Sequence, residues 1–321
     1  MTNSYPIPYH PTWDIIDSSK LNDFISCPRL FFYKHLLGWQ STAPNNHLIF
    51  GSAWHVAMEY LLLNGYDKTD EAYEAFLAYY RNELPEGTDV LFDPKVPSRV
   101  KLALPEYADK YRTDLDEYEV LYTEIAGTVP ITPDIVFYFR MDTILRGVNG
   151  YKSSEHKTKG GSFAANWLTQ WQNNVQVGTY HHVLYCLYPQ DEVDGITLNG
   201  AGFLKTKFDF QRFPFRWQKD RMQVWLETTV HYFYELQDSL NILRECSPNT
   251  DTMSAGGHVA FPLRPTSCDK WFGCPYVDYC CSWPNPLREC EEPPIGFEQR
   301  FWNPVEQPHT HEMDLVEGVK P

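Results

Sequence analysis

The sequence of 321 residues is long enough for one large domain, or one and a half, with a full hydrophobic core. Its net charge of −15 disfavours a general binder of duplex nucleic acid, because contacts to phosphates need Lys and Arg. No window reaches the roughly eighteen uninterrupted apolar residues of a membrane span, and the N-terminus lacks the pattern of a secretory signal. We therefore expect an intracellular, cytoplasmic protein, of a cell or a virus, that does not contact a membrane.

The charges are not spread evenly along the chain. Basic residues gather in 152–159 and 205–221, and acidic residues gather in 67–86, 114–124 and 291–317. A local basic patch is what phosphate binding needs, so the net charge does not exclude a nucleic-acid substrate. Aromatic residues make up 16 % of the chain. We expect most of them in the core, and a stacking surface for bases is the alternative.

The N-terminal third is predicted to be helical after a flexible arm at residues 1–13, which contain three prolines. Asp17 or Ser18 is the expected N-cap of the first helix, and Pro28 is expected to kink or break it. The apolar spacing predicts helices at 18–37, 53–63, 70–83 and 100–116, the last broken near Pro105, with a loop at 85–97.

From Tyr118 onward, short apolar runs separated by turns predict strands, and longer amphipathic runs predict helices. The strands are expected at 119–125, 135–141, 152–158 and 196–205, and the helices at 167–188 and 218–244. This order predicts an α/β fold. We expect a single domain over 14–290, with a helical lobe at 14–117, a core at 118–245 and a cysteine-containing lobe at 262–290, followed by a disordered tail at 291–321.

Two carboxylates and a lysine are predicted to meet at a hairpin. Asp142 ends an apolar run, and Glu155-His156-Lys157 begins thirteen residues later, after an Asn-Gly pair that favours a turn. Closing the hairpin brings Asp142 beside Glu155, and strand alternation places Glu155 and Lys157 on one face with His156 on the other. Two carboxylates can hold Mg²⁺ or Mn²⁺, and the ammonium beside them can contact a phosphate or orient a water.

Other polar residues are predicted to join this group. Gln176 and Tyr180 are four residues apart and share one face of the helix expected at 167–188. His55 follows Gly51 near the start of another helix and could bring a neutral imidazole to the same metal ion.

The cysteines suggest a second metal centre. Cys268, Cys274 and Cys280 lie within thirteen residues, and Cys281 is an alternative to Cys280. Three thiolates need a fourth ligand. Structural zinc sites usually place paired cysteines two to four residues apart, whereas iron–sulfur clusters tolerate more varied spacing. A [4Fe–4S] cluster is therefore favoured here, with Zn²⁺ as the alternative.

In this order and spacing, the whole set resembles the RecB-like branch of the PD-(D/E)XK nucleases, from about Ser18 to Cys281. Within that branch it is most similar to the iron–sulfur exonucleases: CRISPR-associated exonucleases and the nuclease domains of bacterial helicase–nucleases. The resemblance implies a restriction-endonuclease-like core, a central mixed sheet flanked by helices, with a helical N-terminal lobe and a C-terminal iron–sulfur lobe.

The resemblance also implies a role for each residue. Asp142, Glu155 and the carbonyl of His156 would hold the catalytic cation with His55 as a further ligand, Lys157 would position the attacking water, and Gln176 and Tyr180 would fix Lys157 and the DNA strand. Glu124, on the preceding strand, is a possible accessory carboxylate. Cys27, Cys268, Cys274 and Cys280 would hold the cluster, although the interval between Cys268 and Cys274 is longer than the common family form.

The implied activity is metal-dependent hydrolysis of DNA phosphodiesters by an exonuclease acting on single strands or DNA ends, in recombination, repair, or phage or CRISPR-type DNA processing. A helicase or recombination protein would be a separate partner, since the sequence contains no Gly-x-x-x-x-Gly-Lys-Ser/Thr loop. A non-catalytic nucleic-acid-binding scaffold that keeps the fold and a zinc-stabilised endonuclease are the alternatives.

Overall fold

The structure, a computed structural model, describes residues 5–249, 257–269 and 273–315. Its contacts divide the chain into two compact units. The first unit consists of Met1–Ala43, Pro130–Tyr138 and Gln223–Gln307, and the second of Pro44–Val129, Phe139–Met222 and Pro308–Pro321. The consecutive lobes expected from the sequence stay a prediction. None of the helices in the described residues is long and apolar enough to cross a membrane.

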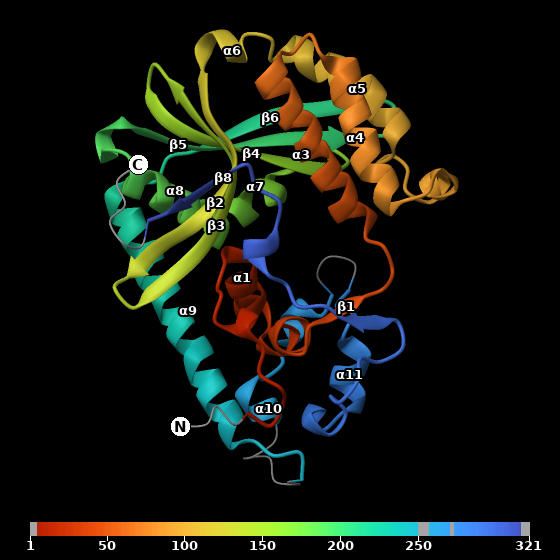
Figure 1. The fold of residues 1–321 in the computed structure, drawn as a ribbon, viewed down its shortest axis with the longest axis vertical. Helices are drawn as coiled ribbons and strands as arrows, with labels where there is room; N and C mark the ends of the chain where they lie inside the picture. The colour runs from red at the N-terminus through yellow and green to blue at the C-terminus, as the bar shows by residue number, and fades with distance from the viewer. Residues whose placement is uncertain (1–4, 250–256, 270–272, 316–321) are drawn as a thin grey trace. The chain divides into compact units, whose positions relative to one another are not determined.

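A six-stranded sheet, in the order β6-β5-β4-β3-β2-β8, is the centre of the second unit (Figure 1). Strand β4 pairs antiparallel with β3 and parallel with β5, and β8 pairs parallel with β2, so the sheet is mixed. The predicted α/β class is confirmed. The strands are β2 (Glu119–Thr132), β3 (Ile135–Gly147), β4 (Gly150–Gly160), β5 (Val193–Phe203), β6 (Phe208–Phe215) and β8 (His311–Asp314).

The predicted hairpin between β3 and β4 is confirmed. Its register pairs Ile144 with Ser153 and Gly147 with Gly150, which leaves Val148 and Asn149 in the turn. Beyond this ladder, the N–H of Ser154 donates to Oγ1 of Thr143 at 3.1 Å, and the N–H of His156, next to Glu155, donates to Oδ2 of Asp142 at 2.7 Å. The sheet therefore brings together the two carboxylates that are thirteen residues apart in the sequence.

Three helices form a layer against one face of the sheet: α3 (Asn46–Asn64), α4 (Thr69–Glu83) and α5 (Pro97–Lys110), followed by the short α6 (Asp114–Glu117). Their core contains Phe50 and Trp54 of α3 together with Phe203 of β5. Helix α5 runs through Pro105 instead of breaking there, because Leu104 and Tyr107 beside the proline are both buried in this core.

The connection from β4 to β5 contains α7 (Ala165–Gln172) and α8 (Val175–Leu187), where the sequence predicts one helix. The chain leaves helical geometry at Asn174, whose side chain accepts a hydrogen bond from the backbone N–H of Gln176 at 2.8 Å. Asn is a strong N-cap, so this residue starts a new helix. The residues of α7 are all at least partly exposed, whereas the middle of α8 is buried.

The first unit contains the N-terminal helices. Asp17 caps α1 (Ser18–Ser26) by accepting a hydrogen bond from the N–H of Lys20 at 2.7 Å, and Pro28 starts α2 (Pro28–Phe31), as predicted. The π-helix η2 (Phe32–Leu36) follows. The first unit also contains β1 (Trp39–Ser41), which pairs antiparallel with β7 (Phe297–Gln299). Its remaining helices are most of α9 (Lys219–Glu245), α10 (Gly257–Ala260) and α11 (Val277–Ser282). The 3-10 helices of the described residues are η1 (Pro11–Trp13), η5 (Pro265–Ser267), η7 (Pro286–Arg288) and η8 (Pro304–Glu306) in the first unit, and η3 (Glu86–Leu91) and η4 (Gln190–Glu192) in the second.

Both ends of the chain differ from the arm and the tail that the sequence predicts. Ile7 and Trp13 are buried, so the described part of the arm packs into the first unit. In the tail, β8 adds a strand beside Gly127, where a side-chain Cβ would lie 1.6 Å from the carbonyl oxygen of Met313. The acidic, proline-rich composition of the tail could not predict these contacts, because they are made with residues far away in the sequence.

Strand β6 and the 3-10 helix η3, which lies inside the predicted loop, were also not predicted from the sequence.

Candidate active site

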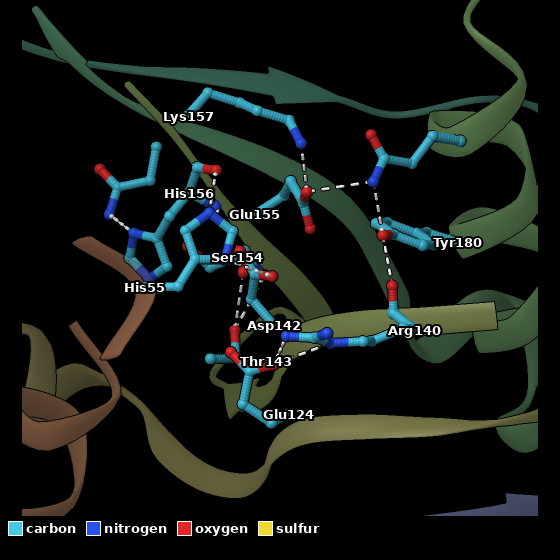
Figure 2. A network of polar contacts seen from close by, with 12 residues as sticks. His55, Glu124, Arg140, Asp142, Thr143, Ser154, Glu155, His156, Lys157 and Tyr180 are labelled. Atoms are coloured by element: carbon cyan, nitrogen blue, oxygen red, sulfur yellow. Dashed lines mark hydrogen bonds and ion pairs between the residues drawn. The ribbon is translucent and has the colours of Figure 1, made fainter. Parts of the chain in front are cut away.

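Asp142 on β3 is held by two contacts that come from different elements. Its Oδ2 accepts a hydrogen bond from the backbone N–H of His156 at 2.7 Å, and its Oδ1 lies 3.2 Å from Nδ1 of His55 on α3 (Figure 2). The side chain is buried, which alone would raise its pKa, but the charge of His55 outweighs burial and the pKa is lowered. Asp142 is therefore ionised throughout the physiological pH range.

His55 links the helical layer to the two central strands. Its second ring nitrogen, Nε2, lies 2.9 Å from the carbonyl oxygen of His156 on β4. Burial alone would lower the pKa of His55, but the opposing effect of the Asp142 carboxylate is larger, and the pKa is raised to about 9. The imidazolium can donate through both nitrogens, which suits an acceptor on either side of the ring.

Glu124 on β2 completes a compact group of possible ligands. In the part of the chain that the structure describes, His55, Glu124 and Asp142 form the one group of three or more His, Cys, Asp or Glu side chains whose ligand atoms all lie within 4.8 Å of one another. Glu124 has a φ of 44°, a left-handed conformation that is rare for a residue other than glycine. Such strain is often found at functional sites.

The charge of Glu124 is balanced by an arginine. Arg140, two residues before Asp142 on β3, donates to Glu124 Oε2 from Nη2 at 2.7 Å and from Nε at 3.0 Å (Figure 2). Burial and the nearby charge of Asp142 raise the pKa of Glu124 to about 7 despite this ion pair. Sequence reasoning assigned Arg140 no role. Its position on the same strand face as Asp142 was the only available signal.

Glu155 on β4 has one engaged oxygen and one free oxygen. Its Oε1 accepts from Nζ of Lys157 at 2.5 Å and from the amide of Gln176 at 3.1 Å. Its Oε2 is buried and has no hydrogen-bond partner in the described residues. Burial, and next the negative charge of Asp142, raise the pKa of Glu155. A bound cation would give the unpaired oxygen a partner and would remove the repulsion between the two carboxylates.

Gln176 and Tyr180 lie on one face of α8, as their spacing predicts. The amide of Gln176 donates to the hydroxyl of Tyr180 at 2.7 Å, and that hydroxyl donates in turn to the backbone carbonyl of Arg140 (Figure 2). The pair thus connects α8 with both central strands. Gln176 contacts Glu155 directly, and Glu155, not Gln176, contacts Lys157.

His156 is anchored from the opposite face of the sheet. Its Nδ1 lies 3.2 Å from the amide nitrogen of Asn199 on β5, and Asn199 also donates to the hydroxyl of Tyr107 on α5. Burial lowers the pKa of His156 to about 3, so its ring is neutral. The sequence did not single out Asn199. Its partners lie 43 and 92 positions away, and no local pattern connects them.

This donor set fits a hard divalent cation. The carboxylates of Glu124, Asp142 and Glu155 are oxygen donors of the kind that Mg²⁺ and Mn²⁺ take, and His55 adds one imidazole nitrogen. The group within 4.8 Å includes Glu124, which the sequence offered only as an accessory residue, and does not include Glu155. Glu155, on the neighbouring strand β4, supplies an unpaired buried oxygen.

The cysteines predicted to form a second centre lie in the first unit. The N–H of Arg264 donates to Sγ of Cys27 at 3.3 Å, and Ser267 Oγ donates to the carbonyl of Ser26 at 2.6 Å. These two bonds hold the segment before Cys268 against Cys27, although more than two hundred positions separate them. Residues 270–272, between Cys268 and Cys274, lie outside the described residues.

The thiols influence one another electrostatically. Burial, and then the neighbouring Cys27 and Cys268, raise the pKa of the Cys274 thiol. Burial raises the pKa of Cys280 to about 12, with Cys274, Cys27 and Cys268 adding to the effect and Arg29 opposing it. Cys281 is exposed. The assignment of these four cysteines as ligands of one centre, with Cys280 or Cys281 as the last, stays a prediction.

One comparison with known proteins identifies the family of the chain. No curated protein matches the sequence. The solved structure of SSO0001 is similar over 66 % of this chain and 74 % of its own, with 14 % sequence identity and a TM-score of 0.27, too low to carry an argument. The mixed six-stranded sheet with flanking helices is consistent with a restriction-endonuclease-like fold. A family model described as the PD-(D/E)XK nuclease superfamily matches residues 18–281. Because this match covers most of the chain, the protein belongs to the PD-(D/E)XK nuclease superfamily, whose members are nucleases that typically use Mg²⁺ or Mn²⁺.

Proposed function

We propose that the protein is a metal-dependent deoxyribonuclease, an exonuclease that hydrolyses phosphodiester bonds in single strands or at DNA ends. The observation that carries the proposal is the grouping of His55, Glu124 and Asp142 within 4.8 Å, beside the unpaired buried oxygen of Glu155. In a chain of this superfamily, that grouping has the composition of a catalytic cation site.

The residues that would hold the cation are Asp142, Glu155, His55 and the carbonyl of His156, with Glu124 as a further carboxylate. Bound there, Mg²⁺ or Mn²⁺ would supply positive charge that polarises the phosphodiester and stabilises the charge that builds up on it. His55 would have to give up one proton in order to become a ligand, because an imidazolium has no free lone pair.

Lys157 would act on the attacking water. Its side chain is 23 % exposed, and its ammonium lies 2.5 Å from Oε1 of a Glu155 side chain that is only 3 % exposed. One end of the ion pair thus reaches solvent while the other is fixed by Gln176. In this role the ammonium orients a water against the phosphorus and stabilises negative charge on the phosphoryl oxygens.

The experiment that tests the activity compares the wild type with Asp142→Asn on end-labelled linear single strands, linear duplex and circular single strands, in Mg²⁺ or Mn²⁺. We expect cleavage of the linear substrates by the wild type only, and circular strands that stay intact. Cutting of the circles would replace the exonuclease with an endonuclease. Cleavage by neither protein on any substrate, with the wild type folded, would favour a binding or scaffold role.

We further propose that Cys27, Cys268, Cys274 and Cys280 hold a [4Fe–4S] cluster with a structural role, as in the iron–sulfur branch of RecB-like nucleases. Thiolates on a single zinc ion lie roughly 3.8 Å apart, given Zn–S bonds of about 2.3 Å. In the described residues, no three cysteine sulfurs lie within 4.8 Å of one another. The intervals between these cysteines along the chain, which iron–sulfur clusters tolerate better than structural zinc sites, support a cluster over zinc.

A further inference from the structure

Four aromatic rings gather beside the proposed catalytic lysine. Phe163 precedes α7, Trp167 and Trp171 lie on α7, and Phe213 lies on β6. The ring centroids of Trp167 lie 4.5 Å from Phe163, 5.7 Å from Trp171 and 5.4 Å from Phe213. We call these four residues the aromatic cluster.

The aromatic cluster shares a sheet face with Lys157. On β5, Gly200 is the register partner of Lys157, and a Cβ at Gly200 would lie 2.6 Å from Cζ of Phe163. The position beside Lys157 on β5 therefore has no side chain, and the ring of Phe163 lies over it. The ammonium of Lys157 lies 5.3 Å from the ring centroid of Trp171. Lys157 thus contacts both the carboxylate of Glu155 and the ring of Trp171 in the aromatic cluster.

The rings are not a buried core. Phe163, Trp167, Trp171 and Phe213 are each partly exposed, and α7 has no buried residue at all. Large aromatic side chains gain most from complete burial, so four of them that keep part of their surface in solvent beside the proposed catalytic lysine offer ring surface to a ligand.

The charge of the protein indicates what that ligand must contribute. A chain with a net charge of −15 repels a polyanion at long range, so phosphate contacts alone give weak binding. Stacking of bases on aromatic rings needs no charge and adds affinity for each base bound. In a duplex the faces of a base are covered by its neighbours, and only an unpaired base can offer its face to a tryptophan.

We propose that the aromatic cluster is a base-binding subsite for the strand being cut, in which an unpaired base next to the scissile phosphate stacks on Trp167 or Trp171. The proposal rests on the nuclease function proposed above. It makes single-stranded DNA, or a frayed end, the preferred substrate, and it assigns that preference to α7.

The test measures binding separately from cleavage. The probes are a fluorescein-labelled oligo(dT) of twelve nucleotides, the same strand annealed in a duplex, and a series of single strands that each carry one abasic site at a different position. Each protein is titrated into each probe in Ca²⁺, and binding is measured by fluorescence anisotropy. The proteins are the wild type, Trp167→Leu, Trp167→Phe, Trp171→Leu and the control Tyr234→Leu, an exposed aromatic on α9.

We expect Trp167→Leu and Trp171→Leu to bind the single strand roughly tenfold more weakly, with Trp167→Phe and Tyr234→Leu close to the wild type. One or two abasic positions should weaken binding to the wild type, and the same positions should have no effect on the leucine variants. Duplex binding should be unchanged.

Three results would overturn the proposal. Leucine variants that bind single strands as tightly as the wild type would contradict the subsite, and so would leucine variants whose affinities for single strand and duplex fall equally. Neither result would contradict the nuclease function if the wild type cleaves DNA. A wild type that neither binds nor cleaves any of these probes would contradict the nuclease function and, with it, the subsite.

Discussion

The side chain of Asp142 on β3 accepts the backbone N–H of His156 on β4 at 2.7 Å. A contact of this kind replaces a ladder hydrogen bond between the two strands with one to a carboxylate, and it fixes the direction of Asp142 through the backbone. The carbonyl of the same His156 meets the ring of His55 at 2.9 Å. The backbone of one residue therefore positions two of the proposed metal ligands.

Cation binding should release a proton from His55. The pKa of His55 is raised to about 9, so at pH 7.5 the ring is charged in the free protein and neutral once it is a ligand. Isothermal titration calorimetry with Mn²⁺ in buffers of different ionisation enthalpy should show close to one proton released at pH 7.5, and affinity should increase with pH up to about 9. The His55→Ala protein should release fewer protons, which come from Glu124, whose pKa is about 7, and from Glu155, whose pKa is raised. Equal proton release from both proteins would show that His55 is not a ligand.

The anchor of His156 should affect both stability and rate. Asn199→Ala leaves Nδ1 of His156 and the hydroxyl of Tyr107 without their buried partner, so urea denaturation should show a loss of about 1–3 kcal/mol in the free energy of unfolding. Because His156 positions Asp142 and His55, the cleavage rate should also fall under conditions where the variant is fully folded. Thr197→Val, two residues earlier on β5, is the control. A folded Asn199→Ala protein with the rate of the wild type would limit Asn199 to a structural role.

Strand β8 should stabilise the edge of the sheet that carries Glu124. The N–H of Thr310 donates to the carbonyl of Glu124 at 2.9 Å, and Gly127→Ala would place its Cβ against the carbonyl of Met313. Displacement of β8 should cost about 1–3 kcal/mol and weaken Mn²⁺ binding. Thermal unfolding and titration with Mn²⁺ measure the two effects. Gly87→Ala, where a Cβ meets nothing within 4 Å, is the matched control. Two glycine variants of equal stability would show that β8 contributes nothing there.

The cysteine centre should contain iron. Protein purified without air should be brown, and Cys27→Ser or Cys274→Ser should lose both colour and solubility, since the ligands come from both ends of the chain. Cys186→Ser on α8, exposed and outside the group, should keep the iron of the wild type. Elemental analysis decides between the metals: zinc in stoichiometric amount without iron would establish the alternative.

Local patterns in the sequence predicted the parts of the site that lie on one element or one hairpin. Glu155 and Lys157 follow from strand alternation, Gln176 and Tyr180 from helical spacing, and Asp142 from the turn at Asn149-Gly150. Glu124 could not be placed in this way, because its direction depends on a left-handed φ of 44°. The hydrogen bonds of Asn199 and the edge strand β8 depend on packing between segments that are distant in the sequence, and the periodicity of a segment carries no information about such packing.

The measurement that tests the account most directly is the single-turnover rate of cleavage of an end-labelled single strand in Mn²⁺ by the wild type, Lys157→Met and Lys101→Met. Lys101 is an exposed lysine on α5 that serves as the control. The account predicts a loss of about a hundredfold or more for Lys157→Met, with stability retained, and no loss for Lys101→Met. A Lys157→Met protein that cleaves as fast as the wild type would contradict it.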